Sequence, residues 1–269
     1  MGRVPQPFPA VVAHRGASAS RAEHTRGAFE QALQQGADGL ECDVRVSRDG
    51  QLVCVHDRRI DRTSNGRGAV SDLTVAEMAG VDFGSWHHPH EPEHGVLTLD
   101  ELLGMLADLR NRPRLFVETK HPARYGGLVE RKLAALLARH GLTTPRVRAD
   151  APVLMMSFAE AAVRRFKAAA PRVPTVLLLS QIRGVRRGGV LPTWADVAGP
   201  DVRLLRADPG FVSRVAALGR DTYCWTVDEP ADIELCKRSG VRYVATNRPD
   251  ATRSHLDDPD LARFGSVAE

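Results

Sequence analysis

The sequence predicts an α/β fold, a closed (β/α)8 barrel with one inserted lobe, on three observations. Short apolar runs alternate with helical patterns almost from end to end, which is typical of a parallel sheet with crossover helices. Nine such runs occur, and a local hairpin accounts for one of them, which leaves eight parallel strands. The 41 residues 57–97 show little periodicity and are long enough for a separate lobe. We therefore expect one domain over residues 1–269, with an insertion at about 57–97.

Each expected strand is a short apolar or β-branched run bounded by polar or turn-forming residues. The expected strands are Ala10–His14, Gly39–Val46, Leu52–His56, Leu115–Lys120, Val153–Ser157, Thr175–Leu179, Val202–Arg206, Tyr223–Thr226 and Arg242–Thr246. Helices are expected where apolar residues recur at helical spacing, and in Thr98–Arg110 the side chains of Thr98 and Glu101 also form a capping box. The other expected helices are Leu128–His140, Ala159–Ala169, Phe211–Leu218 and Ala231–Arg238. The polar, acidic stretch after Pro249 predicts a frayed tail.

Composition excludes several classes of protein. With 43% hydrophobic and 26% charged residues, intrinsic disorder is excluded as the main state. No apolar run approaches the roughly 18–20 residues of a membrane helix, and the first residues lack the apolar region of a signal peptide. We therefore expect a cytoplasmic protein without stable membrane insertion. The net charge of +4 is diffuse, so nucleic acid is not an expected partner, and the four cysteines lack CxxC spacing.

The hairpin brings charged residues together. If Asp49-Gly50 forms a two-residue turn, Asp43 lies directly opposite His56, with Cβ atoms roughly 5 Å apart. Glu41 has the same parity as Asp43 and shares its face. A solvent-facing hairpin is the alternative interpretation, but in a barrel of this kind the functional residues lie at the C-terminal strand ends. We therefore expect Glu41, Asp43 and His56 to converge there.

Two other strands end in charges. His14 and Arg15 end the first strand, and Glu118 and Lys120 end the strand that begins at Leu115. In barrels of this kind, the active site is formed by charged and polar residues at the C-terminal ends of several strands. Three carboxylates without cysteine suit Mg²⁺ or Ca²⁺ better than zinc. An arginine and a lysine suit a phosphate, and two histidines can divide acid and base chemistry. The combination predicts phosphodiester cleavage.

The chain resembles the glycerophosphodiester phosphodiesterase family, whose members are phospholipase C-like TIM-barrel phosphodiesterases, from about Val11 to Pro249. The matching segments are His14-Arg15-Gly16, Gly36-Ala37-Asp38-Gly39-Leu40-Glu41-Cys42-Asp43-Val44, Asp49-Gly50, Val55-His56-Asp57, Asp61-Arg62-Thr63-Ser64-Asn65-Gly66, Leu97-Thr98-Leu99-Asp100-Glu101, Val117-Glu118-Thr119-Lys120, Ser157-Phe158, Trp225-Thr226-Val227, Gly240-Val241 and Thr246-Asn247-Arg248-Pro249. As an ordered set these segments are highly specific, whereas His-Arg-Gly alone is weak. The resemblance implies a TIM barrel with a small insertion after the His-Asp pair.

The resemblance also implies a reaction and roles. The family hydrolyses a glycerophosphodiester, a small-molecule substrate, to sn-glycerol 3-phosphate and an alcohol, with water or the glycerol 2-OH as nucleophile. It implies Glu41, Asp43 and Glu118 as ligands of a divalent cation, Mg²⁺ or Ca²⁺, and His14 and His56 as general acid and base. Phosphate-binding residues would be Arg15 and Lys120. Trp225 would form an apolar wall for the glycerol or alcohol, although a core tryptophan without ligand contact is the alternative.

One segment departs from the family pattern. The usual Pro-Glu-Asn-Thr is Ala22-Glu23-His24-Thr25 in this chain. His24 is therefore expected to place a third titratable imidazole near the mouth of the site, and Glu23 to serve as a polar contact or an outer partner of the metal. The departure puts the substrate preference in question more than the reaction.

Three other functions fit parts of the sequence. A phospholipase D-like enzyme acting on lysophospholipid or sphingomyelin would need an apolar rim on the lobe, which offers only Val81, Phe83 and Trp86. A catalytically silent barrel acting as a binding protein would be suggested by the loss of either catalytic histidine, and both are present. Storage of a transition metal would use the histidine-rich segment of the lobe, although polar, Pro-broken loops often carry histidine without such a role. That segment contains His87, His88, His90 and His94.

Overall fold

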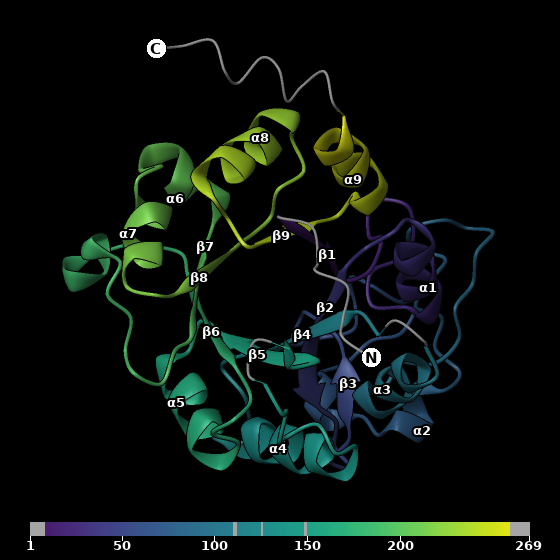
Figure 1. Cartoon of the computed structure of the whole chain (residues 1–269). Coiled ribbons are helices and arrows are strands. Elements are labelled where there is room, and N and C mark those ends of the chain that lie inside the picture. The colour runs from purple at the N-terminus through teal and green to yellow at the C-terminus, as the bar shows by residue number, and fades with distance from the viewer. Residues whose placement is uncertain (1–8, 110–111, 125, 148–149, 259–269) are drawn as a thin grey trace.

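Parallel strands close into a barrel in the computed structural model, which describes residues 9–109, 112–124, 126–147 and 150–258 (Figure 1). The sheet order is β1-β9-β8-β7-β6-β5-β4-β2-β3, and pairing of β1 with β2 closes the ring. All pairs around the ring are parallel, and β3 joins β2 as an antiparallel outer strand. The strands are β1 Ala10–His14, β2 Gly39–Val46, β3 Leu52–Cys54, β4 Arg114–Thr119, β5 Val153–Ser157, β6 Thr175–Leu179, β7 Val197–Pro200, β8 Asp221–Cys224 and β9 Tyr243–Thr246. The predicted TIM barrel is confirmed.

Helices surround the barrel (Figure 1). They are α1 Arg26–Gln34, α2 Val75–Met78, α3 Leu99–Ala107, α4 Leu128–Arg139, α5 Glu160–Ala169, α6 Val202–Ala207, α7 Phe211–Ala217, α8 Pro230–Ser239 and α9 Pro249–Asp257, with 3₁₀ turns at Val70–Asp72 and Gly184–Gly188. The predicted capping box is present, since the Thr98 hydroxyl accepts from Glu101 N and the Glu101 carboxylate accepts from Thr98 N. Arg110, the expected end of that helix, lies outside the described residues.

The apolar core has two main layers. A large cluster fills the space between the strands and the helices, including the four buried leucines of α3. A smaller cluster fills the interior of the barrel, where the Phe116 ring packs against Tyr223 and Tyr243 with both centroid separations at 5.1 Å. The barrel is therefore a solid scaffold, and the residues at its C-terminal end are held by rigid strands.

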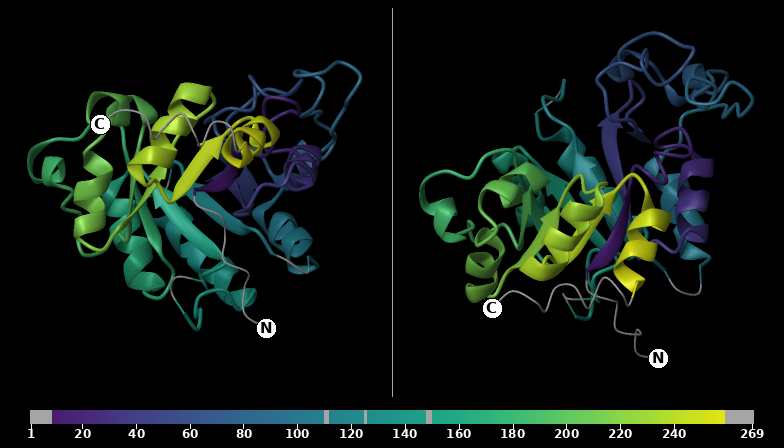
Figure 2. Two further views of the ribbon diagram at one scale, coloured as in Figure 1. Left: turned by 45° about the horizontal axis from the view of Figure 1, so that its top comes forward. Right: turned by 90° about the horizontal axis from the view of Figure 1, so that it is seen from above.

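The inserted lobe has a small core of its own. Ile60, Val70, Met78, Phe83 and Val96 are buried in it, together with two residues of the hairpin. Figure 2 shows the lobe projecting past the C-terminal ends of the strands. The lobe therefore stands beside the end of the barrel where active sites of this fold are built.

The hairpin register differs from the expectation by one residue. Val44 pairs with Cys54, and Ser47 N donates to Gln51 O, so the loop has three residues instead of two. Gly50 closes it in the left-handed region, at φ 79°. Asp43 consequently lies opposite Val55, whose N–H donates to Asp43 O at 3.0 Å. The predicted direct pairing of Asp43 with His56 is wrong.

The seventh strand was also misplaced. The segment predicted as strand Val202–Arg206 belongs to helix α6, and strand β7 comes directly before it. The Asp201 side chain caps this helix by accepting from Arg203 N at 2.8 Å, and the buried residues Val202 and Leu205 are spaced as in a helix. The described chain forms helix α9 over Pro249–Asp257, so the prediction of a frayed tail is wrong for these residues.

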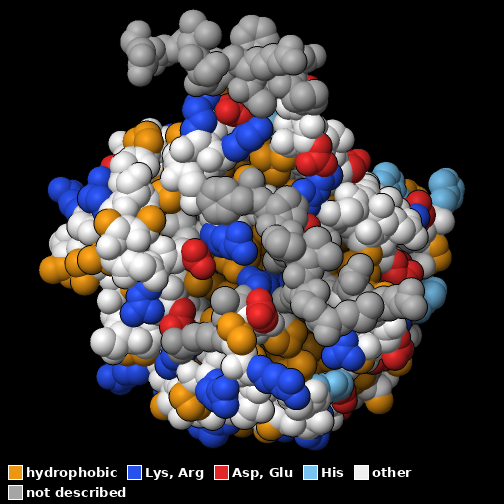
Figure 3. Space-filling view, in the orientation of Figure 1, with side chains coloured by type: hydrophobic (Ala, Val, Ile, Leu, Met, Phe, Trp, Pro, Cys, Tyr) orange, Lys and Arg blue, Asp and Glu red, His pale blue; other side chains and the backbone are white. Residues whose placement is uncertain are grey.

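Charge is spread over the surface. On the face in Figure 3, Lys and Arg side chains are interspersed with acidic ones. No helix of the described part is long and apolar enough to cross a membrane. The cytoplasmic location stays a prediction.

Candidate active site

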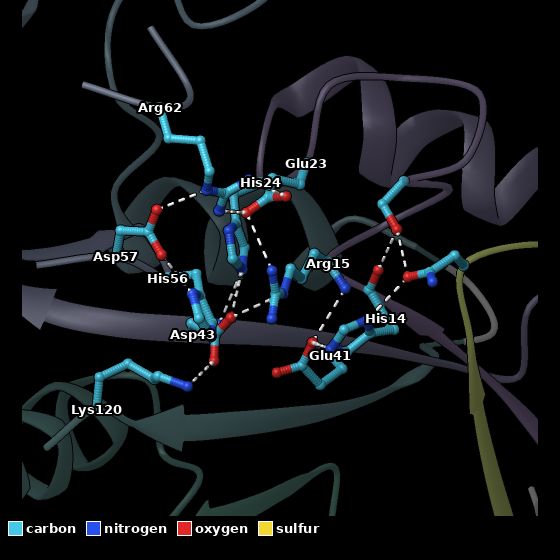
Figure 4. A network of polar contacts seen from close by, with 12 residues as sticks. His14, Arg15, Glu23, His24, Glu41, Asp43, His56, Asp57, Arg62 and Lys120 are labelled. Atoms are coloured by element: carbon cyan, nitrogen blue, oxygen red, sulfur yellow. Dashed lines mark hydrogen bonds and ion pairs between the residues drawn. The ribbon is translucent and has the colours of Figure 1, made fainter. Parts of the chain in front are cut away.

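The register of three strands aligns the predicted residues. His14 pairs with Glu41 across β1 and β2, and Asp43 pairs with Glu118 across β2 and β4. Residues paired in this way point to the same face of the sheet. Their side chains therefore gather at the C-terminal end of the barrel, and Figure 4 shows several of them facing one another.

One cavity of about 200 Å³, open to solvent, is lined by most of these residues. Its lining includes the predicted His14, Arg15, Glu41, His56, Glu118, Lys120 and Trp225. Asp43 lies at the centre of the polar network and is only 1% exposed. All eight predicted site residues are thus brought together, seven on the cavity wall and Asp43 among their polar contacts.

Asp43 is held between two cations. Its Oδ2 lies 3.1 Å from Arg15 Nε and its Oδ1 lies 3.3 Å from Lys120 Nζ, and Lys120 also contacts Glu118 Oε1 at 2.8 Å. Although burial opposes ionisation, Lys120 and Arg15 hold the pKa of Asp43 well below its usual range. Asp43 is therefore a carboxylate at neutral pH.

The two neighbouring carboxyl groups behave differently. Burial, and then the charge of Asp43, raise the pKa of Glu41 well above its usual value and that of Glu118 to about 8. Like charges this close cannot all ionise without compensation. A divalent cation would reduce the repulsion among these three carboxylates more than Lys120 can. Such a cluster of buried carboxyl groups is typical of a metal site.

His14 is oriented by a chain of polar groups. Asn247 Nδ2 donates to Asp228 Oδ2 at 2.6 Å, so Asn247 Oδ1 faces His14 Nδ1, at 2.8 Å, and accepts a hydrogen bond from His14 Nδ1–H. The Nε2 lone pair of His14 is thereby left on the cavity side, 4.0 Å from Glu41 Oε2. Burial and the Arg15 guanidinium lower the pKa of His14 to about 4, so the imidazole is neutral near pH 7.

His56 is oriented by its neighbour in sequence. Its Nδ1 lies 2.7 Å from Asp57 Oδ1, and Arg62 Nε donates to Asp57 Oδ2 at 2.6 Å. Arg62 also bonds both carboxylate oxygens of Glu23, which in turn accepts from Arg15 at 3.2 Å. Burial lowers the pKa of His56 against the attraction of Asp43. The lobe residue Arg62 therefore ties the His56 segment to the loop after β1 (Figure 4).

His24 does not have the role expected for it. It is 5% exposed, and its Nε2 accepts from the backbone N–H of Asp43 at 3.0 Å, 3.4 Å from Asp43 Oδ2. Burial lowers the pKa of His24 to about 3, so it is a neutral hydrogen-bond acceptor instead of a titratable group at the mouth. Its φ of 64° lies in the left-handed region, which histidine and asparagine enter more readily than most residues. Glu23 is engaged with the two arginines.

The His-Arg-Gly turn depends on Gly16. Its φ is +82°, and an added Cβ would lie 2.7 Å from the backbone carbon of Ala28 in α1. The turn presents Arg15, itself at φ 61°, to Asp43. Only glycine combines this conformation with such a close helix contact.

Gly16→Ala is expected to destabilise the fold by roughly 2–5 kcal/mol, combining the cost of a left-handed residue with that of overpacking. Gly36→Ala is the matched control, since Gly36 has φ +76° and nothing within 4 Å of its added Cβ. The control should cost only about 1–2 kcal/mol. Urea unfolding measures both, and equal losses would contradict the role given to the Ala28 contact.

Trp225 and Phe158 form the apolar side of the cavity. Their rings meet edge to face with centroids 5.2 Å apart, and Trp225 Nε1 donates to Gly199 O at 2.8 Å. Phe158 is 40% exposed and lies 6.0 Å from Lys120 Nζ. Trp225 therefore lies on the cavity wall, as the sequence predicts, and Phe158 is a further aromatic residue at the same wall.

One cluster of side chains could hold a metal ion. Within the described residues, one group of three or more candidate ligands occurs, His24, Glu41 and Asp43, with ligand atoms within 4.8 Å of one another. The histidines of the lobe form no such group in that part of the chain, so a metal store there has no support.

Sequence reasoning missed the residues that orient the histidines. Asp57, Arg62 and Asn247 stand in segments that carry the family resemblance, and Asp228 follows one of them. Their presence in those motifs was the available signal. Their role could not be assigned, because Asn247 lies 233 residues from His14 in the chain.

Comparisons with known proteins agree with this geometry. Residues 14–251 match the model of the glycerophosphoryl diester phosphodiesterase family. The chain belongs to this family. A probable glycerophosphodiester phosphodiesterase 1 from Mycobacterium tuberculosis is 48% identical over 255 residues, covering 93% of each chain. A glycerophosphodiester phosphodiesterase from Bacillus subtilis is 34% identical, covering 89% of this chain and 84% of the relative.

Solved structures show the same fold. A glycerophosphodiester phosphodiesterase from Agrobacterium tumefaciens superposes with a TM-score of 0.77 at 28% identity, over 92% of this chain and all of the other. A phosphodiesterase from Oleispira antarctica, in complex with the product sn-glycerol-3-phosphate, gives 0.80 at 25% identity, over 93% and 97% of the two chains. This glycerophosphodiester phosphodiesterase is thus a phosphoric diester hydrolase on a TIM barrel.

Proposed function

We propose that the enzyme hydrolyses soluble glycerophosphodiesters to sn-glycerol 3-phosphate and an alcohol, in a reaction that depends on Mg²⁺ or Ca²⁺. The observation that carries the proposal is the single cavity lined by two histidines, two carboxylates, an arginine and a lysine, with Asp43 among their polar contacts. The product-bound Oleispira antarctica relative supports the same product for this chain.

The donor set fits a hard divalent cation. Asp43 Oδ2 is buried and makes an ion pair with Arg15 but no hydrogen bond, and a carboxylate oxygen of Glu41 lies within 4.8 Å of an Asp43 carboxylate oxygen. We assign Glu41, Asp43 and Glu118 as the residues that would hold the ion, with Glu118 ion-paired to Lys120 in the present arrangement. When bound, such an ion polarises the phosphoryl oxygens and lowers the pKa of the attacking hydroxyl.

The histidines suit proton transfer. His14 is neutral near pH 7, with its Nδ1 proton held by Asn247 and its Nε2 free to accept a proton. His56 is oriented by the carboxylate of Asp57, which opposes the lowering of the His56 pKa by burial and so helps this imidazole to carry a proton during the reaction. Arg15 and Lys120 provide fixed positive charge for the phosphate, and Trp225 with Phe158 provides an apolar wall for the glycerol.

The lobe favours soluble over lipid substrates. Phe83 is 6% exposed within the core of the lobe, and Val81 is half-buried. Trp86 is 39% exposed and lies under the Arg62 guanidinium, 5.9 Å from its carbon. One partly covered tryptophan gives too little apolar surface for stable insertion into a lipid assembly. This observation weighs against the phospholipase D-like alternative.

A substrate panel tests the proposal. We expect release of sn-glycerol 3-phosphate from glycerophosphocholine and glycerophosphoglycerol in Mg²⁺ or Ca²⁺, and little hydrolysis of micellar lysophosphatidylcholine or sphingomyelin. The measurement is enzymatic detection of the released glycerol phosphate. Activity confined to the lipid assemblies would overturn the proposal in favour of the lipid-directed alternative.

A further inference from the structure

A second cavity, open to solvent, lies beside the active-site cavity and shares Lys120 with it. Its walls come from β2, the inserted lobe and the loop after β4. The charged residues of its lining are Arg45, Arg58, Lys120 and Arg124, and no acidic residue accompanies them among the described residues. We call this space the arginine cleft. Although Lys120 and Arg124 are ion-paired with carboxylates outside the lining, positive charge gathered on the wall of a concave site attracts an anion.

Two of the arginines lack a counter-ion. Arg45 is half-buried and donates Nε–H to the backbone oxygen of His56 at 2.9 Å. Within the described residues, neither Arg45 nor Arg58 forms an ion pair, whereas Arg124 pairs with Asp72. A partly buried guanidinium without a counter-ion is energetically unfavourable, and a bound anion would neutralise its charge. Arg45 is in this position, whereas Arg58 is exposed and lines the same cleft, so its guanidinium can bind the same ligand.

The arginine cleft adjoins the active site at Lys120. Lys120 lines both spaces, and His56, which holds Arg45 through its carbonyl oxygen, lines the active-site cavity. A third cavity, which His14 also lines, carries two carboxylates, Glu23 and Asp228, beside two arginines, Arg15 and Arg248. Of these three cavities, the arginine cleft alone is lined by cations without a carboxylate, so it is the one that favours an anionic substituent.

We propose that the arginine cleft binds a second anionic group on the alcohol half of the substrate. The preferred substrates are then glycerophosphodiesters whose alcohol carries a phosphate monoester or a further phosphodiester, with the scissile phosphate between His14 and His56. Guanidinium groups bind phosphate oxygens in pairs of parallel hydrogen bonds, which suits this class of ligand. A cationic alcohol such as choline would gain no binding energy from the cleft, so its diester would be a weaker substrate than an anionic one. The inference rests on the proposed function, since it places the glycerol phosphate half in the active-site cavity.

Two substrates that differ by one phosphate test the inference. With saturating Mg²⁺, we expect kcat/KM for glycerophosphoinositol 4-phosphate to exceed that for glycerophosphoinositol by about tenfold or more. Arg58→Gln should remove about tenfold of this preference through KM, with kcat and the neutral substrate unchanged, and Arg45→Gln should act in the same direction. Arg59→Gln is the matched control, because Arg59 is exposed, pairs with Asp61 at 3.1 Å and does not line the cleft.

Each outcome decides the inference. Equal kcat/KM for both substrates, or a preference that survives Arg58→Gln and Arg45→Gln, overturns it while the proposed function stands. If neither diester is hydrolysed, the proposed function fails. In that case, calorimetry compares the binding of inositol 4-phosphate with that of inositol. Anion binding by the cleft is supported only if inositol 4-phosphate binds more tightly and Arg58→Gln loses this difference. Two further assays compare the wild-type enzyme with Arg58→Gln: binding of inorganic phosphate and flotation with anionic vesicles. If Arg58→Gln loses either kind of binding while the wild-type enzyme shows no preference between the two substrates, the cleft is a site for free anions or for lipid, and the proposal is overturned.

Discussion

Glu41→Gln is expected to abolish turnover together with its dependence on a divalent cation. The substitution keeps the size of the side chain and removes one of three charged ligands from a site that binds its ion through charge. Glu41 is 1% exposed, and its backbone and Oε2 both accept from Arg15 N, at 3.1 and 3.0 Å. A glutamine oxygen can retain the latter bond, so the fold should remain intact. Turnover and equilibrium dialysis of Mg²⁺ and Ca²⁺ measure the two effects.

A surface carboxylate provides the control for this experiment. Glu30→Gln removes the same charge from α1, where the Glu30 side chain is 51% exposed and pairs with Arg26 at 3.9 Å. Turnover and metal binding should stay at the wild-type level in this variant. The metal site as assigned is wrong if Glu41→Gln retains wild-type turnover and an unchanged metal titration.

His14→Ala and His56→Ala should each lower kcat by roughly 10²–10⁴-fold, the usual contribution of a general acid or base. Both side chains line the cavity and are oriented by hydrogen bonds from their Nδ1 atoms, so their removal takes away proton transfer and leaves the barrel intact. His140→Ala is a suitable control, because His140 contacts Asp100 away from the site. Steady-state kinetics and circular dichroism separate loss of catalysis from loss of folding.

The two variants also test the roles separately. The His56 assignment fails if His56→Ala turns over at the wild-type rate, and the same holds for His14. Because His14 is held by Asn247 and His56 by Asp57, the pair has no shared hydrogen bond that would make one variant mimic the other.

The site residues at the ends of the strands could be predicted because the face to which a strand residue points depends on its position along that strand alone. Glu41 and Asp43 share a face whatever the neighbouring strand does, and charges after β1 and β4 reach the same end of any parallel barrel. The hairpin register required the loop length, and Asp49-Gly50 is compatible with either two or three loop residues. His56 still reaches the cavity because β3 ends at Cys54 and the following segment, bound to Asp57 and Arg62, positions it.

Other features depend on contacts that no local pattern encodes. The burial of His24 against Asp43 follows from the packing of the loop after β1 onto β2, and it converts an expected titratable group into a hydrogen-bond acceptor. The strand at β7 was missed because Gly199 and Pro200 resemble a turn, while the apolar residues of α6 resemble a strand. In both cases tertiary packing outweighs the local preference.

The most direct test of the account is the metal dependence of sn-glycerol 3-phosphate release by the wild-type enzyme. The protein is stripped with a chelator, freed of it by dialysis, and assayed on glycerophosphoglycerol while Mg²⁺ or Ca²⁺ is titrated back. We predict that the stripped enzyme releases no glycerol phosphate, and that activity returns with the cation and saturates. Full release of glycerol phosphate by metal-free enzyme would contradict the assignment of the carboxylate cluster as the catalytic metal site.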